Sequence, residues 1–313
     1  MTNRANPSGD YRQNGTDIQK DLAEYFLGLQ AGDRIPSVRE FSNTYGMSVG
    51  AVSIALNTLE ETGAVTLEKR GHMGSYLTTR SVGMLWNLIG RGPMVIAMSL
   101  PMHIRFEGLA TAVKQVLEAA GIGIYFIFIR GSDNRLKALH DSRCHAVLMS
   151  KLSSEEKDSV ANEVLLELPP GTWLSDYGVY YRKQAEDKKE GYTVGVDFQS
   201  YDHHMITQME FGGRQVQMKS VSYVHVAQML RNNEIDAFVW NKDQMDTLAS
   251  PEIAYRPLSE TVRREIGNKV LTAVFVGKPS DGAVRTVLRE YMDPQRITEL
   301  QRKVVSREIL PNY

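Results

Sequence analysis

Three segments between residues 32 and 76 constrain the fold of this chain more than any other feature. The first is Gly32-Asp33-Arg34-Ile35-Pro36-Ser37-Val38-Arg39-Glu40, the second is Ser48-Val49-Gly50-Ala51-Val52-Ser53, and the third is Gly71-His72-Met73-Gly74-Ser75-Tyr76. Ser37 and Glu40 have the spacing of a helix capping box, so a helix is expected to begin there. Ser48 can cap a further helix, and Gly46 can end the helix before it. The segments therefore predict two helices in quick succession, followed by a glycine-flanked loop.

The apolar residues predict which side of each helix is buried. They form one face each of three helices, namely Ile18, Leu22, Phe26 and Leu29, then Val38, Phe41 and Tyr45, then Val52, Ala55, Leu56 and Leu59. Spacings of three and four residues are typical of amphipathic helices. After Gly63, residues 64–69 and 75–79 have the pattern of two short strands. Three helices followed by a hairpin predict an α+β winged helix-turn-helix head over residues 16–79.

This head resembles the GntR family of bacterial regulators, in which the pattern G-D-x-[IL]-P-S-x-R-E precedes a recognition helix and a G-x-G wing. The resemblance implies a homodimer whose third helices enter successive major grooves of a double-stranded DNA operator. It implies that Ser37 and Arg39 contact DNA, that Ser48 and Ser53 lie on the recognition helix, and that residues 71–74 form the wing tip. With the exposed positions added, the candidate DNA contacts are Arg34, Ser37, Arg39, Ser48, Val49, Gly50, Ser53, Asn57, Lys69, Arg70 and His72.

Two features of the head depart from the expected pattern. Many GntR members have arginines on the recognition helix where this chain has Val49 and Ser53, which removes the usual bidentate reader of guanine. Residues 1–80 contain eight Lys and Arg against nine Asp and Glu, a net charge of −1. Phosphate binding must therefore depend on where the cations are placed rather than on bulk charge.

The composition is that of an ordinary protein without membrane segments. The chain has 313 residues, of which 42% are hydrophobic and 23% charged, enough for two or three compact units. No apolar stretch approaches the ~18 residues of a membrane span, and the polar start lacks the apolar core of a signal peptide, so a cytoplasmic location is expected. The single cysteine, Cys144, lies in an apolar context and is expected to be buried and inert. Residues 1–15 are expected to be disordered.

Residues 80–92 form an apolar linker, since Met84 to Ile89 contain only one polar residue, Asn87. Such a segment is expected to pack against something, because linkers are normally polar. Two interpretations are open. The segment can be a docking helix on its own effector domain, or a dimer contact that relays the state of the C-terminal part to the DNA-binding heads.

From residue 93 onward, strand and helix patterns alternate and predict an α/β fold with mostly parallel sheets. Within it, residues 139–150 align without gaps on residues 230–241, each segment reading as helix end, tight turn and buried strand. This internal correspondence predicts two similar lobes. Lobe 1 is expected to comprise about 93–182 and 268–313, and lobe 2 about 191–257. The crossing segments are expected near Arg182 and over residues 257–269.

The C-terminal part looks like a type 2 periplasmic-binding-protein fold, the architecture also used by LysR-type effector domains. The likeness covers about residues 93–313 and is carried by residues 192–202 and 233–238. A GntR-like head joined to such a bilobal module most resembles the YhfZ-like regulators. The resemblance implies an architecture and leaves the ligand open.

The predicted lobes indicate where a small-molecule effector would bind. Ligands collect beyond the carboxyl ends of parallel strands, where helix N-termini offer free N–H groups. The candidate ligand-binding residues at these ends are Ser99, Arg105, Arg130, Ser132, Ser150, Ser200, Tyr201, Ser222, Tyr223, Trp240 and Asn241. This hydroxyl-rich and aromatic set favours a small polar, anionic metabolite, with Arg105 and Arg130 as counter-charges.

Catalytic and metal-binding patterns are not found in the sequence. The adjacent His203 and His204 point about 100° apart on a helix, and the other histidines lack metal-type spacing, so no metal is expected. P-loop and C-x-x-C motifs are also absent, and no cofactor is expected. The one G-x-S-x-G match, at residues 46–50, falls on the predicted helix end and helix cap and does not follow a strand, as a catalytic serine of that motif would. The chain is therefore interpreted as a DNA-binding transcriptional regulator and not an enzyme. A DNA-tethered enzyme and a C-terminal module that only dimerises remain as alternatives.

Overall fold

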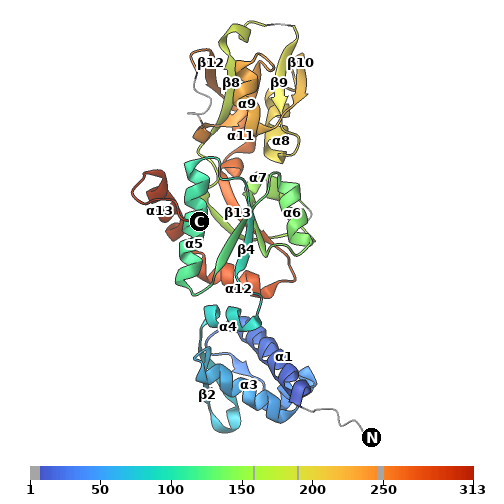
Figure 1. The fold of residues 1–313 in the computed structure, drawn as a ribbon, viewed down its shortest axis with the longest axis vertical. Coiled ribbons are helices and arrows are strands. Elements are labelled where there is room, and N and C mark those ends of the chain that lie inside the picture. The colour runs from blue at the N-terminus through green and yellow to red at the C-terminus, as the bar shows by residue number, and fades with distance from the viewer. Residues whose placement is uncertain (1–7, 158, 189, 245–249) are drawn as a thin grey trace. The chain divides into compact units, whose positions relative to one another are not determined.

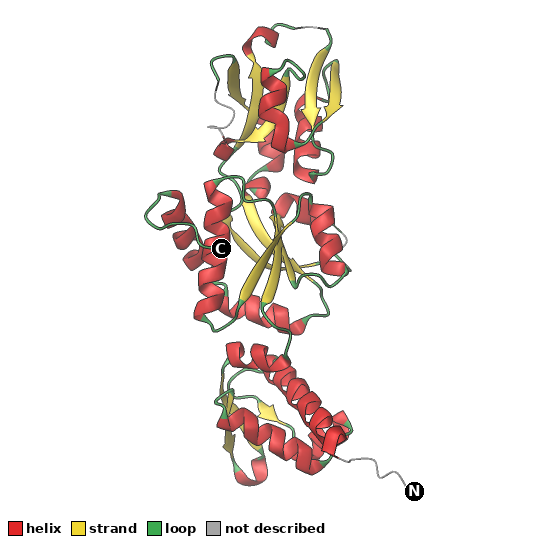
Figure 2. Cartoon of the chain, viewed as in Figure 1, coloured by secondary structure: helices red, strands yellow, loops and turns green. Residues whose placement is uncertain are grey.

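The computed structural model describes residues 8–157, 159–188, 190–244 and 250–313, and it divides into two compact units (Figures 1 and 2). Unit 1 contains the chain up to Met94 together with residues 117–123 and 281–291. Unit 2 contains residues 95–116, 124–280 and 292–313. Among the described residues, no helix combines the length and the apolar character that a membrane crossing requires.

Unit 1 begins with three helices, α1 (Ser8–Leu27), α2 (Val38–Tyr45) and α3 (Val49–Glu61). The predicted capping box is present, because Ser37 Oγ accepts from the Glu40 N–H and the Glu40 carboxylate accepts from the Ser37 N–H. Gly46 ends α2 in the left-handed region at φ 64°, where a side chain would be strained. Ser48 Oγ caps α3 at Ala51 N–H. The prediction of two helices joined by a short turn is confirmed.

A small antiparallel sheet completes the head. Its strands are β1 (Arg34–Ile35), β2 (Val65–Lys69) and β3 (Ser75–Arg80), in the order β1-β3-β2, and a short 3-10 turn (Gly71–Met73) forms the tip of the β2–β3 hairpin. The core contains apolar residues expected from the helical periodicity, including Ile18, Leu22, Phe26, Phe41 and Leu59, and also Leu77 of β3. Burial of these side chains, at ~25 cal/mol per Å² of apolar surface, stabilises the three-helix arrangement.

The expectation of disorder over residues 1–15 is wrong for Ser8 to Gly15, which belong to α1, while residues 1–7 lie outside the described residues. The apolar periodicity that begins at Ile18 forms the stable part of the helix. Extending a helix that already exists costs much less than nucleating one, so the polar residues before Ile18 can continue it.

The predicted linker is helix α4 (Val82–Ile89), which packs inside unit 1. Val82, Leu85, Trp86 and Ile89 are buried, Trp86 Nε1 donates to Gly92 O at 2.9 Å, and Asn87 Nδ2 donates to Gly121 O at 3.1 Å. Gly83 is required by close approach, because a Cβ there would lie 2.0 Å from the carbonyl oxygen of Ala120. The segment thus docks within its own chain, but on α1 of the head as well as on residues 120–121, and a contact between two copies stays a prediction.

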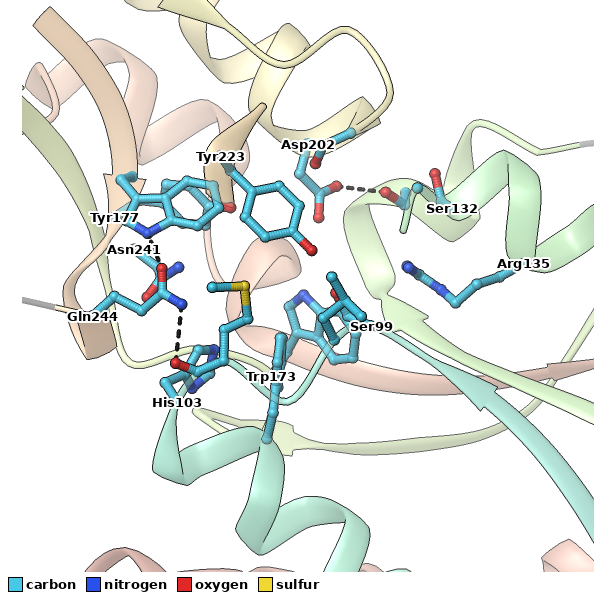
Figure 3. A pocket seen from close by; sticks show the side chains of 17 residues that line it. Ser99, His103, Ser132, Arg135, Trp173, Tyr177, Asp202, Tyr223, Asn241 and Gln244 are labelled. Atoms are coloured by element: carbon cyan, nitrogen blue, oxygen red, sulfur yellow. Dashed lines mark hydrogen bonds between the residues drawn. The ribbon is translucent and has the colours of Figure 1, made fainter. Parts of the chain in front are cut away.

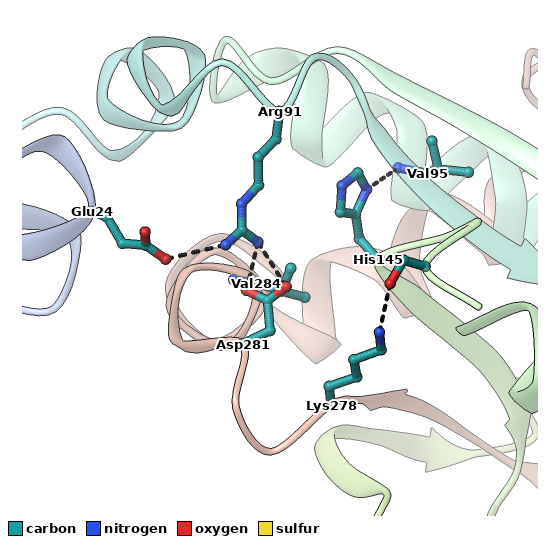
Figure 4. Close-up of polar contacts among 8 residues, drawn as sticks. Glu24, Arg91, Val95, His145, Lys278, Asp281 and Val284 are labelled. Carbon is teal, nitrogen blue, oxygen red and sulfur yellow. Dashed lines mark hydrogen bonds and ion pairs between the residues drawn. The ribbon is translucent and has the colours of Figure 1, made fainter. Parts of the chain in front are cut away.

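Helix α12 (Gly282–Tyr291) is the other distant segment of unit 1, and ion pairs attach it to the head. Arg91 contacts both Asp281, at 2.7 Å, and Glu24 of α1, at 3.1 Å (Figure 4). Arg80 donates to Leu29 O and pairs with Glu290 of α12. Residues 117–123 and 281–291 were expected in lobe 1, so the actual unit 1 is larger than the predicted head.

The first lobe of unit 2 is a five-stranded sheet in the order β5-β4-β6-β13-β7. The strands are β4 (Met94–Met98), β5 (Ile124–Phe128), β6 (Ala146–Ser150), β7 (Glu163–Pro170) and β13 (Thr272–Gly277). β4 and β6 are parallel, whereas β13 runs antiparallel to both of its neighbours. The lobe's helices are α5 (Ile104–Ala119), α6 (Ser132–His140), α7 (Lys151–Glu155) and α13 (Pro294–Val305). Cys144 is buried in this lobe, as expected.

The second lobe repeats this arrangement with the strand order β10-β9-β11-β8-β12. Its strands are β8 (Tyr177–Arg182), β9 (Tyr192–Val196), β10 (Val216–Ser220), β11 (Ala237–Asn241) and β12 (Ile253–Pro257). Its helices are α8 (Tyr201–Phe211), α9 (Val226–Arg231) and α11 (Glu260–Ile266). β9, β10 and β11 are parallel, and β8 is antiparallel to β11 and β12.

The chain enters the second lobe earlier than predicted. β8, which was expected to end lobe 1 at Arg182, lies in the sheet of lobe 2, so the first crossing is at residues 171–176. Its apolar sequence fits a central strand of either sheet, and periodicity cannot choose between them. The return crossing lies between α11 and β13, at residues 267–271, and overlaps the end of the predicted range.

The internal correspondence is confirmed residue by residue. Residues 146–150 form β6 and the aligned residues 237–241 form β11. The turn before each strand contains a non-glycine residue with positive φ at the aligned position, Ser142 at 57° and Asn233 at 63°. Asn tolerates this conformation well and Ser less so. The same uncommon backbone conformation at both aligned positions therefore supports the correspondence between the lobes.

Candidate functional site

The predicted DNA-contacting residues lie on α2, α3 and the strands and tip of the hairpin, and nearly all are exposed. Ser53 is half-buried, and the exposed members are Arg34, Ser37, Arg39, Ser48, Val49, Gly50, Asn57, Lys69, Arg70 and His72. Helix α3 therefore has an apolar inner face, with Val52, Ala55, Leu56 and Leu59 buried, and an open outer face. An exposed helix of this length can enter a major groove.

The local contacts of these residues show which of them keep free charge. Arg70 pairs with Glu68 at 2.7 Å and lies over the ring of Tyr76, at 4.4 Å from its centroid. Its charge is partly neutralised within the hairpin. Ser37 and Ser48 already accept hydrogen bonds as helix caps. Their hydroxyl hydrogens are still able to donate to a phosphate oxygen.

The outer face of α3 also carries an apolar residue that the sequence analysis missed. Ile54 is 69% exposed and Val49 is 51% exposed, both unusually high for large aliphatic side chains on a helix. Exposed aliphatic groups on such a helix can contact the methyl group of thymine in the major groove. The signal was available, because Ile54 falls one turn after Gly50, on the face assigned to DNA.

Unit 2 contains a cavity of about 60 Å³ between its two lobes. Such a volume holds about four or five water-sized groups. Figure 3 shows its lining, which comes from residues after β4, β5 and β6 in lobe 1, from residues after β9 and β10 and at the end of β11 in lobe 2, and from Trp173 and Tyr177 at the first crossing. Six of the predicted ligand-binding residues line it, namely Ser99, Ser132, Ser200, Tyr223, Trp240 and Asn241. The strand-end argument therefore brings these six residues together around one cavity, and their role in ligand binding stays a prediction.

The cavity contains buried polar atoms without hydrogen-bond partners among the described residues. These are Ser132 Oγ, Arg135 Nε, Tyr223 OH, Asn241 Oδ1 and both ring nitrogens of His103. Leaving one such atom unsatisfied costs about 1–3 kcal/mol, so native proteins rarely contain many of them in one place. Their concentration around a single cavity indicates a binding site for a polar molecule.

Arg135 is the cation of this cavity, and the sequence analysis missed it. It lies on α6, is 5% exposed, and donates from Nη1 to Ile129 O at 3.0 Å. Burial lowers the pKa of its guanidinium to about 10, opposed by the nearby charge of Asp202. Periodicity could not identify it, because an arginine in the first turns of an amphipathic helix is normally solvated.

Asp202 is the anion of the cavity and was missed as well. It lies in the first turn of α8, is 6% exposed, and accepts from Ser153 Oγ at 2.7 Å. Burial raises its pKa, while hydrogen bonds from Ser150 and Ser153 and the charge of Arg135 act in the opposite direction. In Figure 3 the side chains of Tyr223 and Arg135 approach Asp202 and Ser99 from opposite sides.

The prediction that Arg105 and Arg130 provide the counter-charges is wrong. Neither lines the cavity, because each pairs with a carboxylate of the other lobe. Arg105 contacts Asp243 at 2.9 Å and donates to Gly171 O at 2.7 Å. Arg130 contacts Asp197 at 2.8 Å. These pairs hold the lobes together at the rim of the cavity, so both arginines act between the lobes.

Three further predicted residues do not line the cavity. Ser150 is buried and accepts from Ser153 N–H as the cap of α7, which positions Ser153 for Asp202. Tyr201 has the ammonium of Lys157 over its ring, at 4.8 Å. Ser222 precedes a 3-10 turn without a side-chain cap bond. They are excluded from the lining because each strand end contributes several residues, of which only some point inward.

The aromatic wall of the cavity completes the site. His103 packs on Phe106 with 4.1 Å between ring centroids, and Phe106 packs on Trp173 at 4.6 Å. Burial lowers the pKa of His103 to about 4, so the imidazole is neutral at pH 7. Gln244 donates to Met102 O at 3.1 Å and accepts from the indole N–H of Trp240. These two hydrogen bonds connect lobe 2 to lobe 1 at this end of the cavity. Among the described residues, no cluster of His, Cys, Asp and Glu could hold a metal ion.

Comparison with known proteins places the chain in a family. The family model for the YhfZ C-terminal domain matches residues 82–313, and a model for a helix-turn-helix domain matches residues 30–77. The protein YhfZ of Escherichia coli (strain K12) is 31% identical over 294 residues, which cover 93% of this chain and 95% of that protein.

Solved structures include two that are similar over large parts of the chain. The crystal structure of YhfZ from Shigella flexneri has a TM-score of 0.61 at 26% identity, covering 74% of this chain and 98% of that chain. A hydrogen-peroxide-bound mutant of OxyR from Corynebacterium glutamicum has a TM-score of 0.46 at 12% identity, covering 97% of both chains. With its N-terminal helix-turn-helix domain and a C-terminal domain that matches over residues 82–313, the chain belongs to the YhfZ family.

Proposed function

We propose that this protein is a cytoplasmic transcriptional regulator of the winged helix-turn-helix class whose affinity for its operator is set by a small polar metabolite. The observation that carries the proposal is the presence, in one chain, of an exposed helix α3 and a cavity with several unpartnered polar atoms. The first feature fits a DNA groove and the second fits a ligand that carries an anionic group. The GntR-like motif over residues 32–40 supports the subfamily assignment.

The strand orders support a type 2 periplasmic-binding-protein-like module. Each sheet has one strand that directly follows a crossing between the lobes, β13 in lobe 1 and β8 in lobe 2, and this strand is antiparallel to its neighbours. When the other four strands of each lobe are numbered along the chain, both sheets have the order second, first, third, crossing strand, fourth. Two such lobes joined by two crossing segments can open and close about a ligand. The residues 171–176 and 267–271 are the crossings that would absorb this motion.

A relay from the cavity to the head is built into helix α5. Its first turn contributes Phe106 to the cavity wall, and its last residues, 117–119, belong to unit 1. There the following residues, Ala120 and Gly121, contact α4 through Gly83 and Asn87. A ligand that favours one lobe arrangement can thus change the packing of α4 against the head. It can do so only to the extent that it binds the two arrangements with different affinity.

We further propose that the protein acts as a homodimer and binds its metabolite without converting it. Helix-turn-helix proteins read half-sites in successive major grooves, which requires two heads. The cavity has hydrogen-bonding groups suited to recognition, and its histidine packs on the ring of Phe106.

The test uses the full chain and an operator selected by this protein from random duplex DNA. Binding is measured by fluorescence anisotropy for wild type and for Tyr223→Phe, which removes one unpartnered hydroxyl while keeping the ring, each with and without metabolite extract. Wild type is expected to change its operator affinity with the extract, and Tyr223→Phe to respond less. An identical response of the two proteins, or no selected operator at all, would contradict the proposal.

A further inference from the structure

Two buried groups of opposite charge face the cavity without forming a direct ion pair with each other. Arg135 and Asp202 are 5% and 6% exposed, and both line the cavity. Asp202 is bound by the hydroxyls of Ser150 and Ser153, and Arg135 donates to a backbone carbonyl. Among the residues that the structure describes, neither group forms an ion pair. Their charged atoms therefore lie more than 4 Å apart, with the cavity beside them.

Burying a charge without an ionic partner is costly, and a pair of such charges on one cavity is best explained by a ligand that carries both partners. We propose that the cavity binds the zwitterionic head group of a small α-amino acid, with its carboxylate on Arg135 and its ammonium on Asp202. This assignment rests on the proposed function and names the class of its metabolite. The sequence favoured a simple anion as the ligand, whereas the head group proposed here is a zwitterion and carries no net charge.

The surrounding hydroxyls fit the carboxylate end. Ser132 Oγ and Tyr223 OH lack partners and lie with Arg135 Nε around the same space (Figure 3). Together they offer up to three donors to a carboxylate, whose two oxygens accept about four hydrogen bonds. A simple anion would place its charge beside the carboxylate of Asp202, and a simple cation would place its charge beside Arg135. A zwitterion meets an opposite charge at both positions.

The other end of the cavity limits the side chain of this amino acid. In Figure 3, His103, Asn241 and Gln244 lie on the side away from Arg135. Asn241 Oδ1 and both nitrogens of His103 are unpartnered there. A short side chain that both donates and accepts hydrogen bonds, such as a hydroxyl or an amide, would satisfy them. With a cavity of about 60 Å³, long aliphatic and aromatic side chains do not fit.

The experiment titrates the full-length protein by calorimetry with each of the twenty standard amino acids. The strongest binder is then compared with two analogues, its α-hydroxy acid, which lacks the ammonium, and its amide, which lacks the carboxylate. Asp202→Asn and Arg135→Gln are titrated in parallel, because each removes one charge while keeping most of the shape. Arg143→Gln, on the exposed turn after α6, is the matched control, and thermal melting checks that every variant is folded.

We expect one or a few small polar amino acids to bind, and both analogues to bind at least about tenfold more weakly, because each leaves a buried charge unpaired. Asp202→Asn and Arg135→Gln should lose affinity to the same extent or more, and Arg143→Gln should match wild type. Failure of all twenty amino acids to bind would overturn the inference, as would equal binding of the α-hydroxy acid. If the hydroxy acid, or inorganic phosphate, binds and changes operator affinity, the regulator function stands and only the zwitterion is wrong.

Discussion

Arg130 and Asp197 join the two lobes of unit 2 by an ion pair of 2.8 Å in which Asp197 accepts from Nε and Nη2 of the guanidinium. The Asp197 side chain is 1% exposed, whereas Arg130 is 27% exposed and also lies over the ring of Tyr223, at 5.4 Å. Asp197 accepts in addition from the N–H groups of Gln199 and Tyr223. One carboxylate thus organises the entrance of the cavity and the turn that carries Tyr223.

Arg130→Met should weaken the contact between the lobes. Removing one partner of a buried pair costs about 3–5 kcal/mol, and the partial exposure of Arg130 reduces this to about 1–3 kcal/mol. We expect a lower midpoint in urea unfolding and a larger radius of gyration in X-ray scattering. Lys137→Met is the control, because its pair with Asp141 on α6 is exposed and contributes little. A variant as stable and as compact as wild type would show that this pair does not hold the lobes together.

Gly83→Ala should destabilise unit 1. The added Cβ would lie 2.0 Å from the Ala120 carbonyl oxygen, and backbone cannot move away as easily as a flexible side chain. Overpacking of this kind costs about 1–3 kcal/mol, measured as a lower free energy of unfolding in urea. Gly50→Ala is the matched control, because it lies in a helix with no atom within 4 Å of the new Cβ and should gain stability by helix propensity. Equal effects of the two substitutions would contradict close docking of α4.

Much of the fold could be predicted from the sequence, because local patterns determine it. The capping box at Ser37, the glycine stop at Gly46 and the apolar strands all depend on neighbouring residues, and the structure has them where the pattern placed them. The assignment of β8 to a lobe failed for the opposite reason. Its side chains are largely buried, and which sheet it joins is decided by strands far away in the sequence.

Six of the predicted residues line the cavity, whereas the charged residues of its lining, Arg135 and Asp202, were not among those predicted. Strand ends in parallel sheets must meet at one edge, so Ser99, Ser132 and Tyr223 could be placed together without a structure. Arginine pairing depends on which carboxylate comes within reach across the lobes, and this has no local signal. Arg130 therefore looked free and is paired, whereas Arg135 looked solvated and is buried.

Arg39→Ala should weaken operator binding and reduce its dependence on salt. Arg39 is exposed in the first turn of α2, where an arginine can reach a phosphate. Loss of one phosphate contact lowers the slope of log affinity against log salt concentration by about 1. The measurement is a salt titration of operator binding by anisotropy, with Arg296→Ala on α13 as a control for the loss of one surface charge. An unchanged slope would remove Arg39 from the interface.

Ile54→Ala should reduce specificity with no loss of stability. The Ile54 side chain is 69% exposed and contributes little to the core, so the thermal midpoint should stay the same. If Ile54 contacts a thymine methyl, the variant should bind the selected operator less tightly, with non-specific binding unchanged. Replacing each thymine of the operator by uracil, which lacks the methyl group, should reproduce the loss at one position and have no further effect on the variant. If no uracil substitution weakens binding by wild type, the thymine contact is wrong.

The buried histidine of the cavity should make the protein less stable at acidic pH. Burial disfavours the charged imidazolium, which lowers the pKa of His103 from 6.5 to about 4, opposed by Asp243 and assisted by Arg105. Between these two values the unfolded chain binds a proton that the folded protein does not, so the free energy of unfolding must fall as the pH is lowered from about 6.5 to 4. The difference of pKa corresponds to ~3 kcal/mol in total at pH 4 and to none above pH 7.

The contribution of His103 can be separated from that of the other buried histidine. His203, whose pKa is also lowered to about 4 by burial, acts in the same direction. His103→Gln should therefore retain only part of the acid destabilisation, whereas His72→Gln, at the exposed hairpin tip, should behave as wild type. Urea unfolding at pH 7 and pH 5 distinguishes the variants, because His103→Gln must lose less stability between these values than wild type does. The same pH dependence in His103→Gln and wild type would mean that folding does not shift the pKa of His103, so that the imidazole becomes a second cation of the cavity at acidic pH.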